Sequence, residues 1–586
     1  MLTALLFSAA LTTPVLPPAI PWNGASRALA VPATDPWVTP SEATGFRTTP
    51  RYDETIAYLR RLVAAAPQLK MISIGRSHEG RDLWLVIASK ERAFTPEALR
   101  RGGKPTFYAQ GGIHAGEIDG KDAGLMLLRD MTVRGTKREL LDRANFLFVP
   151  IFNVDGHERF SRYCRINQRG PEECGWRTNA RNFNLNRDYV KADTLEMRAM
   201  IRMLREWQPD LQADLHVTDG SDYQYDITYG WNGAAGWSPS IGAWLDATLR
   251  PALDRGLRAM GHIPGPLIFS DDPLTTGITD GQDDPRLSTG YGDARHLPAV
   301  LLENHSLKPY NQRVLGTYVF LEQILRVLAA EGGVLRAAAE RDRAARPARI
   351  PLSWKAPDGD PPLVEFLGIE ARHVLSPVSG DVRLEWTGKP VMGRVPFRVA
   401  SEVATSVAVP RAYWIPATWS DVIEKLDLHG IAYERIAEPR EVEVEMTRFA
   451  APKYDAQQFE GHVRVTAPGT SEHRRERFSA GSVRVSTDQP LGTLAALMLE
   501  PASPDSLFQW GFFNSILSPT EYVEPYIMEP MAERMLAENP KLAAEFAKKV
   551  ESDDAFRADA RARLQWFYER TPFYDERARL YPVGRE

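Results

Sequence analysis

The alternation of apolar strands with amphipathic helices over roughly residues 53–330 restricts the fold of this chain more than any other feature. Short apolar runs stand at 71–77, 83–89, 105–110, 145–153, 211–217 and 299–304. Runs with helical spacing lie among them, at 53–66, 117–131, 194–207 and 314–330. Continuous apolar strands that alternate with helices are typical of a sheet covered on both faces. We therefore predict an α/β fold with a mixed, largely parallel sheet flanked by helices.

The pattern changes near residue 335, where a charged, alanine-rich run ends in proline. From 355 to 487, short alternating runs predict antiparallel strands with one exposed face. Helical runs dominate the last hundred residues. The predicted division is a signal peptide at 1–30, an α/β domain at 45–335, a β-rich accessory domain at 355–487 and a mostly helical region at 488–586.

The N-terminal segment predicts export to the periplasm or the extracellular space. Residues 2–20 carry no charge, and Ala28-Leu29-Ala30 fits the small-residue cleavage pattern of a signal peptide. The usual positive segment is missing, since the first basic residue is Arg27, and a disordered tail is the alternative. The apolar stretch is too short to cross a bilayer, and no later run predicts a membrane span.

Charge and cysteine content exclude two classes of protein. Lys and Arg number 71 against 76 Asp and Glu, a net charge of −5, and no dense basic run predicts a nucleic-acid partner. The two cysteines, Cys164 and Cys174, are too few for a four-cysteine zinc site. In an exported protein they can pair and close a short loop, or they are two unrelated thiols.

A histidine and a glutamate at a strand-to-helix bend predict a metal site. His114 follows an apolar strand and Glu117 opens the next helix, so their side chains can converge. Imidazole nitrogen and carboxylate oxygen both bind zinc, and a catalytic zinc needs a third protein ligand. His216, which ends another apolar strand, is the best candidate. Asp214 either supports His216 from behind or forms a separate buried pair.

Further motifs follow in a fixed order: Asn153-Val154-Asp155-Gly156, Arg162-Tyr163-Cys164-Arg165-Ile166-Asn167, Asn184-Leu185-Asn186-Arg187-Asp188 and Leu301-Leu302-Glu303. Together with His114-x-x-Glu117 and the distant His216, this series resembles the M14 family of zinc metallocarboxypeptidases, carboxypeptidase A-like, of a bacterial multi-domain type. The resemblance spans roughly residues 50–330 and implies a carboxypeptidase-like sheet there. Val154 stands where the family usually has proline.

The resemblance implies a role for each of these residues. His114, Glu117 and His216 would hold one Zn²⁺, and Glu303 would be the general base as zinc-bound water attacks a peptide bond. Arg165 would stabilise the oxyanion, with Arg177 as the rival. Asn186 and Arg187 would bind the terminal carboxylate of a peptide with a free C-terminus.

The tyrosine that covers the substrate in the family is hard to assign. Tyr291 takes this role in our prediction, although it lies closer to Glu303 than expected, and Tyr310 is the other candidate. The Gly- and Asp-rich stretch 270–293 replaces the usual loop.

Three functions are compatible with these residues. The first is an exported zinc carboxypeptidase. The second is a related zinc amidohydrolase acting on cell-wall peptides or N-acyl amino acids. The third is a binding protein with an inactive peptidase domain, against which the complete set of ligands and Glu303 argues.

Overall fold

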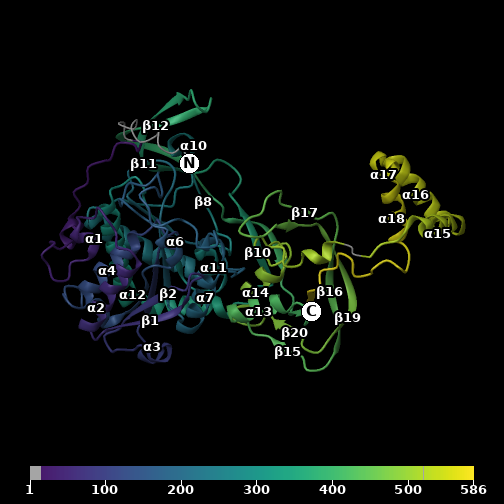
Figure 1. Ribbon diagram of the computed structural model, residues 1–586, viewed down its shortest axis with the longest axis horizontal. Coiled ribbons are helices and arrows are strands. Elements are labelled where there is room, and N and C mark those ends of the chain that lie inside the picture. The colour runs from purple at the N-terminus through teal and green to yellow at the C-terminus, as the bar shows by residue number, and fades with distance from the viewer. Residues whose placement is uncertain (1–14, 519–520) are drawn as a thin grey trace, which may run out of the picture.

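A computed structural model gives the architecture of residues 15–518 and 521–586 (Figure 1). The predicted signal peptide lies partly outside these residues, because residues 1–14 are not described. The chain forms an α/β body, a β-rich unit beside it and a helical unit that stands apart at the far end (Figure 1). Of the helices in the described ranges, none has the length and apolar character needed to cross a bilayer.

The α/β body is built on an eight-stranded sheet in the order β1-β2-β4-β3-β5-β9-β6-β7. Its strands are β1 (Leu69–Arg76), β2 (Asp82–Ala88), β3 (Thr106–Gly111), β4 (Asn145–Val149), β5 (Leu211–Val217), β6 (Ile227–Gly230), β7 (Pro264–Gly265) and β9 (Ala299–Asn304). The central strands β4, β3, β5 and β9 run parallel. Strand β1 pairs antiparallel with β2, β2 with β4, and β6 with β9, whereas β6 and β7 are parallel. The predicted mixed, largely parallel sheet is confirmed.

Alternate residues of the central strands face different layers. On β3, Phe107 and Ala109 pack among helices α2 (Tyr52–Ala65), α4 (Asp119–Met131), α9 (Arg250–Ala259) and α12 (Tyr310–Ala344). Tyr108 faces the opposite layer, which contains α7 (Leu195–Trp207) and the β-rich unit. Since both faces are covered, these strands are continuously apolar. The helix predicted at 314–330 and the charged run after residue 335 belong to one helix, α12.

The β-rich unit has a six-stranded sheet in the order β15-β20-β14-β21-β16-β19. Its elements are β14 (Ala412–Ile415), α13 (Ser420–His429), β15 (Glu434–Arg435), β16 (Arg440–Phe449), β19 (Gly469–Phe478), β20 (Val483–Ser486), α14 (Gly492–Leu499) and β21 (Gly584–Arg585). The expected boundary at 487/488 does not match this arrangement. Helix α14 is buried in the unit's core, and β21 returns from the far end of the chain to complete the sheet.

Two hairpin-like pairs precede this sheet. Strand β10 (Arg349–Lys355) pairs with β13 (Glu402–Ala408), and β11 (Leu363–Leu375) pairs with β12 (Val382–Val399). The end of β12 also joins β8 (Ile278–Asp280) of the body. Figure 1 shows the far end of the β11–β12 hairpin standing out at the top of the molecule.

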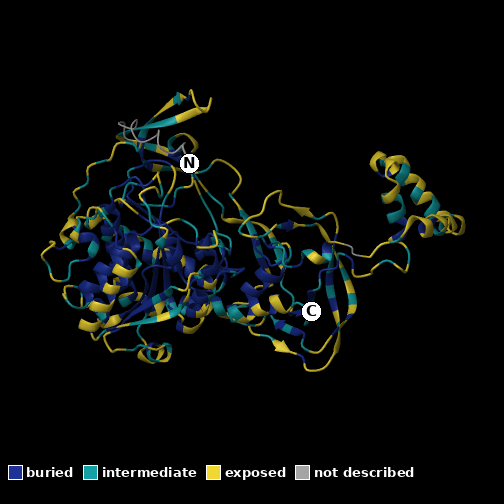
Figure 2. Cartoon of the chain, in the orientation of Figure 1, coloured by how far each residue is buried: buried dark blue, intermediate teal, exposed yellow. Residues whose placement is uncertain are grey.

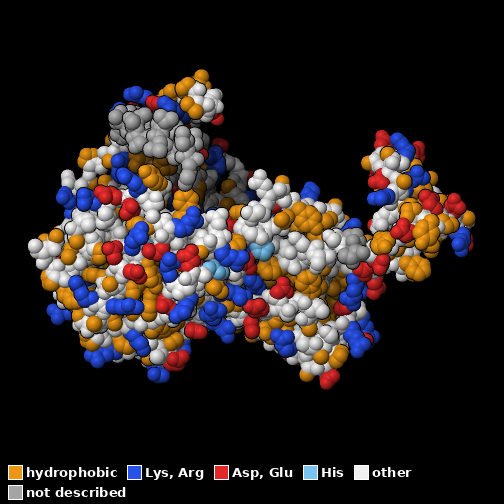
Figure 3. Space-filling view, in the orientation of Figure 1, with side chains coloured by type: hydrophobic (Ala, Val, Ile, Leu, Met, Phe, Trp, Pro, Cys, Tyr) orange, Lys and Arg blue, Asp and Glu red, His pale blue; other side chains and the backbone are white. Residues whose placement is uncertain are grey.

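The helical unit consists of α15 (Pro525–Glu538), α16 (Pro540–Ser552), α17 (Asp554–Ala558) and α18 (Ala560–Tyr568). It has a small core of its own, which includes Met528, Phe556 and Trp566. In Figure 2 this unit is mostly exposed or half-buried, in contrast to the body. Figure 3 shows Lys and Arg interspersed with Asp and Glu over the drawn face, in keeping with the small net charge.

Candidate metal centre

The predicted ligands meet at the carboxyl ends of two adjacent parallel strands. His114 lies in the turn after β3 and Glu117 just before α4, while His216 is on β5, which pairs with β3. Gly112 has φ +67°, a conformation that glycine adopts without strain, and it bends the chain out of β3. This bend lets the histidine and glutamate, three residues apart, turn toward one point.

The three side chains are buried and in contact. His114 Nδ1 lies 3.0 Å from Glu117 Oε1, and His216 Nδ1 lies 3.0 Å from Glu117 Oε2. One ligand atom from each residue lies within 4.8 Å of the others, and no other such cluster of His, Cys, Asp and Glu occurs among the described residues. Two imidazoles and one carboxylate are the donor set of many catalytic zinc sites, so the residues fit this ion.

Each histidine uses its other ring nitrogen to contact a supporting oxygen. His216 Nε2 lies 2.9 Å from Asp214 Oδ2, and His114 Nε2 lies 2.9 Å from Asn184 Oδ1. Such contacts fix the ring orientation of metal-binding histidines. The supporting reading of Asp214 is therefore the one that the structure favours. Asn184 was not predicted to have this role, although it belongs to the motif Asn184-Leu185-Asn186-Arg187-Asp188.

Glu303 lies beside the cluster on β9. It stands opposite His216 in the register of β5 and β9. Its Oε2 atom is buried and makes no hydrogen bond to the described residues. Burial raises the pKa of Glu303 to about 8, and the positive charge of His216 opposes this shift while Glu117 adds to it. An unpartnered carboxyl group beside a metal site is a candidate general base.

Both candidate arginines contact Glu117, but their surroundings differ. Arg165 Nη1 lies 2.6 Å from Glu117 Oε1, and its other donors bind Gln168, the Val217 and Thr218 carbonyls and Asp219. Arg177 Nη1 lies 3.1 Å from the same oxygen. The Arg177 side chain is 38% exposed, against 7% for Arg165, so Arg177 is the more accessible to a ligand.

A disulfide connects the segments that carry these arginines. Cys164, directly before Arg165, is bonded to Cys174, three residues before Arg177. The pairing alternative is therefore the correct one for the two cysteines, and the reduced-thiol alternative is wrong in this structure. The bond restrains both ends of the loop next to Glu117.

Asn186 and Arg187 lie in the short helix η2 (Leu185–Arg187), which follows Asn184. Asn186 Oδ1 accepts a hydrogen bond from the Ser288 backbone N–H at 3.2 Å. The Arg187 guanidinium donates to the Asn186 carbonyl at 2.7 Å and is half-buried. Because Asn184 contacts His114, the helix begins directly after a residue that touches the metal cluster.

The structure does not bring Tyr291 or Tyr310 to this centre, which contradicts the predicted substrate-covering role. Tyr291 is fully buried, and its hydroxyl lies 2.8 Å from His429 Nδ1 and accepts a hydrogen bond from Arg295. Tyr310 is also buried and donates to Asp122 at 2.6 Å. Both tyrosines pack between elements of the fold and have their hydroxyls occupied.

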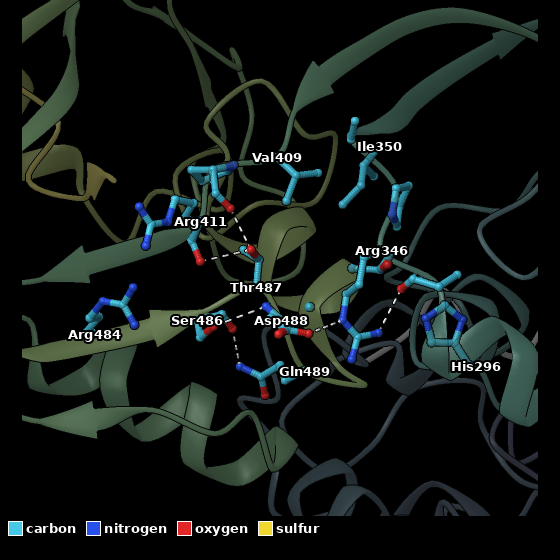
Figure 4. A pocket seen from close by; sticks show the side chains of 16 residues that line it. His296, Arg346, Ile350, Val409, Arg411, Arg484, Ser486, Thr487, Asp488 and Gln489 are labelled. Atoms are coloured by element: carbon cyan, nitrogen blue, oxygen red, sulfur yellow. Dashed lines mark hydrogen bonds and ion pairs between the residues drawn. The ribbon is translucent and has the colours of Figure 1, made fainter.

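A separate pocket lies between the end of α12 and the β-rich sheet, about 570 Å³ in volume (Figure 4). Its arginines are largely paired: Arg346 binds Asp488, and Arg484 binds Glu586. None of the predicted site residues lines this pocket.

Comparisons with known proteins find similarity to carboxypeptidases. Residues 55–232 match the family model described as zinc carboxypeptidase, Peptidase M14. "Carboxypeptidase 2" of Trichophyton rubrum is 22% identical over 489 residues, which cover 79% of this chain and 84% of the relative. "Carboxypeptidase 2" of Trichophyton tonsurans is 23% identical over 509 residues, covering 82% and 87%. A metallo-carboxypeptidase structure from Burkholderia cenocepacia is 19% identical with a TM-score of 0.34, covering 47% of this chain and 68% of that one.

Proposed function

We propose that this protein acts as an exported exopeptidase that removes C-terminal residues from peptides. The chain contains an M14 zinc carboxypeptidase domain and is a metallocarboxypeptidase. The observation that carries the proposal is the buried His114–Glu117–His216 cluster with the unpartnered Glu303 carboxyl on the adjacent strand. Export rests on the N-terminal pattern, and the Cys164–Cys174 bond is compatible with an oxidising compartment.

His114, Glu117 and His216 would hold zinc, with Asp214 and Asn184 fixing the two imidazoles. When bound there, zinc supplies Lewis-acid chemistry that acidifies water and polarises a carbonyl. Glu303 accepts a proton from the attacking water at its free Oε2 atom and passes it to the nitrogen of the departing amine. For this step Glu303 must be ionised, and a nearby dication would lower its raised pKa.

We assign the oxyanion contact to Arg177 in place of Arg165. A guanidinium can stabilise developing negative charge only if donors remain available. Arg165 already has several partners, including Glu117 and Asp219, and it orients Glu117. Within the described part of the chain, the Arg177 side chain donates only to Glu117, and it is partly exposed.

Asn186 and Arg187 would bind the terminal carboxylate of the substrate. Arg187 donates to one backbone carbonyl, which leaves further N–H groups for a two-pronged contact with a carboxylate. This contact would restrict the enzyme to peptides with a free C-terminus.

The proposal is tested with the purified zinc-loaded protein and with Glu303→Gln. The wild type should release the last residue of a peptide with a free C-terminus, lose this activity on chelation, and leave the amidated peptide intact. Glu303→Gln should bind zinc normally and lose activity by at least about a thousandfold. Full activity of Glu303→Gln would overturn the mechanism.

The substrate panel should also contain a cell-wall peptide and an N-acyl amino acid. Preferential cleavage of either would favour the alternative amidohydrolase. Stoichiometric zinc without turnover of any substrate would favour the inactive binding protein.

A further inference from the structure

The segment 183–193, which carries Asn184, Asn186 and Arg187, is held by the β-rich unit. Its last residues contact α13 and the 459–462 turn. His429 Nε2 lies 2.9 Å from the Val190 carbonyl. Asp193 is bound on both oxygens, by Lys425 Nζ at 2.9 Å and by His462 Nε2 at 2.7 Å. Charge-assisted contacts of this kind fix the far end of the segment.

Glu460 of the β-rich unit reaches the near end of the same segment. Its Oε2 atom accepts a hydrogen bond from the Asn184 backbone N–H at 2.8 Å. Glu460 has φ +49°, a strained conformation for a residue with a side chain, so the surrounding structure must stabilise the turn. The next residue, Gly461, packs so closely on Phe183 that an added Cβ would lie 2.6 Å from the Phe183 ring.

Asn184 connects this contact to the metal centre and to the carboxylate ligands. Its side-chain oxygen lies 2.9 Å from His114 Nε2 and also accepts from the Asn186 N–H at 3.0 Å. Its carbonyl accepts from the Arg187 N–H at 3.0 Å. A change in the position of Asn184 would therefore move Asn186 and Arg187 together.

Glu460 also acts on the charge of Arg187. Burial and the neighbouring Arg286 and Arg177 lower the pKa of Arg187, whereas Glu460 and Asp283 oppose this shift. A carboxylate close to Arg187 competes with an incoming carboxylate for the same positive charge. For a substrate carboxylate bound at Arg187, the charge of Glu460 would weaken binding, whereas its hydrogen bond to Asn184 would support the binding arrangement.

We propose that Glu460 is a positioning residue through which the β-rich unit completes the site for the substrate's terminal carboxylate. Its hydrogen bond to Asn184 holds Asn186 and Arg187 in their binding arrangement. The inference rests on the proposed function, because it assumes that Arg187 binds the C-terminal carboxylate.

The experiment compares Glu460→Ala and Glu460→Gln in the full chain, with the exposed Glu438→Ala as the matched control. Glutamine keeps an acceptor for the Asn184 N–H and removes the charge, whereas alanine removes both. We expect Glu460→Ala to raise KM for a free-carboxylate peptide about tenfold with kcat changed less than about twofold. Glu460→Gln should keep KM at or below the wild-type value, and Glu438→Ala should match the wild type.

A binding measurement separates this inference from the proposed function. Calorimetric titration of the metal-free protein compares one short peptide with its C-terminal amide. Wild type should prefer the free carboxylate, and Glu460→Ala should lose most of this preference. A wild type without any preference would overturn carboxylate recognition itself. Two results would overturn the positioning role alone. One is a preference for the free carboxylate that is retained in Glu460→Ala. The other is an equal loss of kcat in Glu460→Ala and Glu460→Gln together with a lowered melting temperature.

Discussion

At the scale of single residues, each histidine of the metal cluster is defined by both of its ring nitrogens. One nitrogen faces Glu117, and the other faces Asp214 or Asn184. Although burial disfavours charge on His216, the Asp214 carboxylate raises the pKa of His216 well above its usual range. Asp214 therefore increases the electron density that His216 can offer to a metal ion.

Replacing Asp214 with asparagine should weaken zinc binding about 10- to 100-fold, because the supporting charge is lost while the shape is kept. Competition with a chromophoric chelator measures the affinity. Asp226→Asn is the matched control, since Asp226 forms a similar buried pair with His262 at 2.6 Å outside the cluster. Equal zinc affinity of Asp214→Asn and wild type would contradict the supporting role.

Kinetic measurements should distinguish the roles of Arg165 and Arg177. Arg177→Ala should lower kcat about 10²- to 10³-fold at full zinc occupancy, as expected for the loss of an oxyanion donor. Arg165→Ala should mainly reduce zinc affinity and stability, because Arg165 is buried against Glu117 and Asp219. Loss of kcat in Arg165→Ala alone, with zinc retained, would restore the assignment made from the sequence.

Local sequence patterns predicted the residues whose positions depend on the sheet. His216 and Glu303 stand near the ends of adjacent parallel strands, and His114 and Glu117 lie in the turn that follows β3, so the sheet suffices to bring them together. Tyr291 could not be assigned in this way. Its hydroxyl is occupied by His429, a residue of α13 whose approach depends on how the β-rich unit packs.

At the scale of elements, the segment around the short helix η1 (Ala25–Leu29) is part of the folded body. Trp22 Nε1 donates to the Gly261 carbonyl at 2.8 Å. Ser26 is fully buried, and its hydroxyl lies 2.8 Å from His262 Nε2. The predicted cleavage after Ala30 would remove both contacts, and this cleavage stays a prediction.

A chain that begins at residue 31 should be less stable than one that begins at residue 15. Loss of Ser26 alone leaves the buried His262 Nε2 without this partner, at a cost of about 1–3 kcal/mol. Urea unfolding of the two chains and of Ser26→Ala measures the difference. N-terminal sequencing of the protein isolated from its native host then shows whether residues 22–30 are kept. Equal stability of the three proteins would show that the segment contributes nothing.

Helix α13 makes the contact between the units sensitive to acid. Burial lowers the pKa of His429 from 6.5 to about 3. The unfolded chain therefore takes up a proton below about pH 6.5 that the folded protein does not accept until about pH 3. The stability contributed by neutral His429 is lost as the pH falls through this range.

At pH 5 the free energy of unfolding should be lower by about 2 kcal/mol because of His429. His429→Gln does not titrate and can still donate to the Val190 carbonyl, so its stability should fall less on acidification. Urea unfolding at pH 7 and pH 5 gives the comparison, and the other histidines cancel because both proteins contain them. A pH 7-to-5 difference that is the same in both proteins would argue against His429 as the sensitive group.

The elements of the body were predictable from periodicity, and those of the β-rich unit less so. The helix predicted at 194–207 is α7, and the strand predicted at 211–217 is β5. Within the stretch 355–487 that was predicted to form short antiparallel strands, residues 462–466 contain only the two-residue strand β18 (Val465–Thr466). The length of the β11–β12 hairpin was not expected either. Antiparallel strands depend on partners far along the chain, which a local pattern does not encode.

At the scale of the whole molecule, the body and the β-rich unit share one hydrophobic core. A single cluster joins Tyr108 and Met200 of the body to Tyr413 and Val483 of the β-rich sheet. Figure 2 shows buried residues continuing from one into the other. The β-rich unit is therefore not an appended domain, and its removal would expose a large apolar face of the body.

The helical unit has a different relation to the rest of the chain. The helical unit has a separate core. The chain leaves and re-enters the β-rich unit at neighbouring points, because the Arg579 N–H donates to the Ile516 carbonyl at 3.0 Å. Replacing residues 519–575 with a short Gly/Ser linker should preserve the sheet that β21 completes. A chain ending at residue 345 should instead aggregate, because it lacks the β-rich half of the shared core.

Soluble yield, melting temperature and zinc content compare these two chains with the wild type. We expect the linker variant to bind zinc stoichiometrically and to retain activity within about twofold, since no metal-centre contact involves the helical unit among the described residues. A soluble, zinc-binding chain ending at residue 345 would show that the body folds alone. Even then, this chain should lose carboxylate recognition, because it lacks Glu460 and therefore the hydrogen bond from Glu460 to the Asn184 N–H.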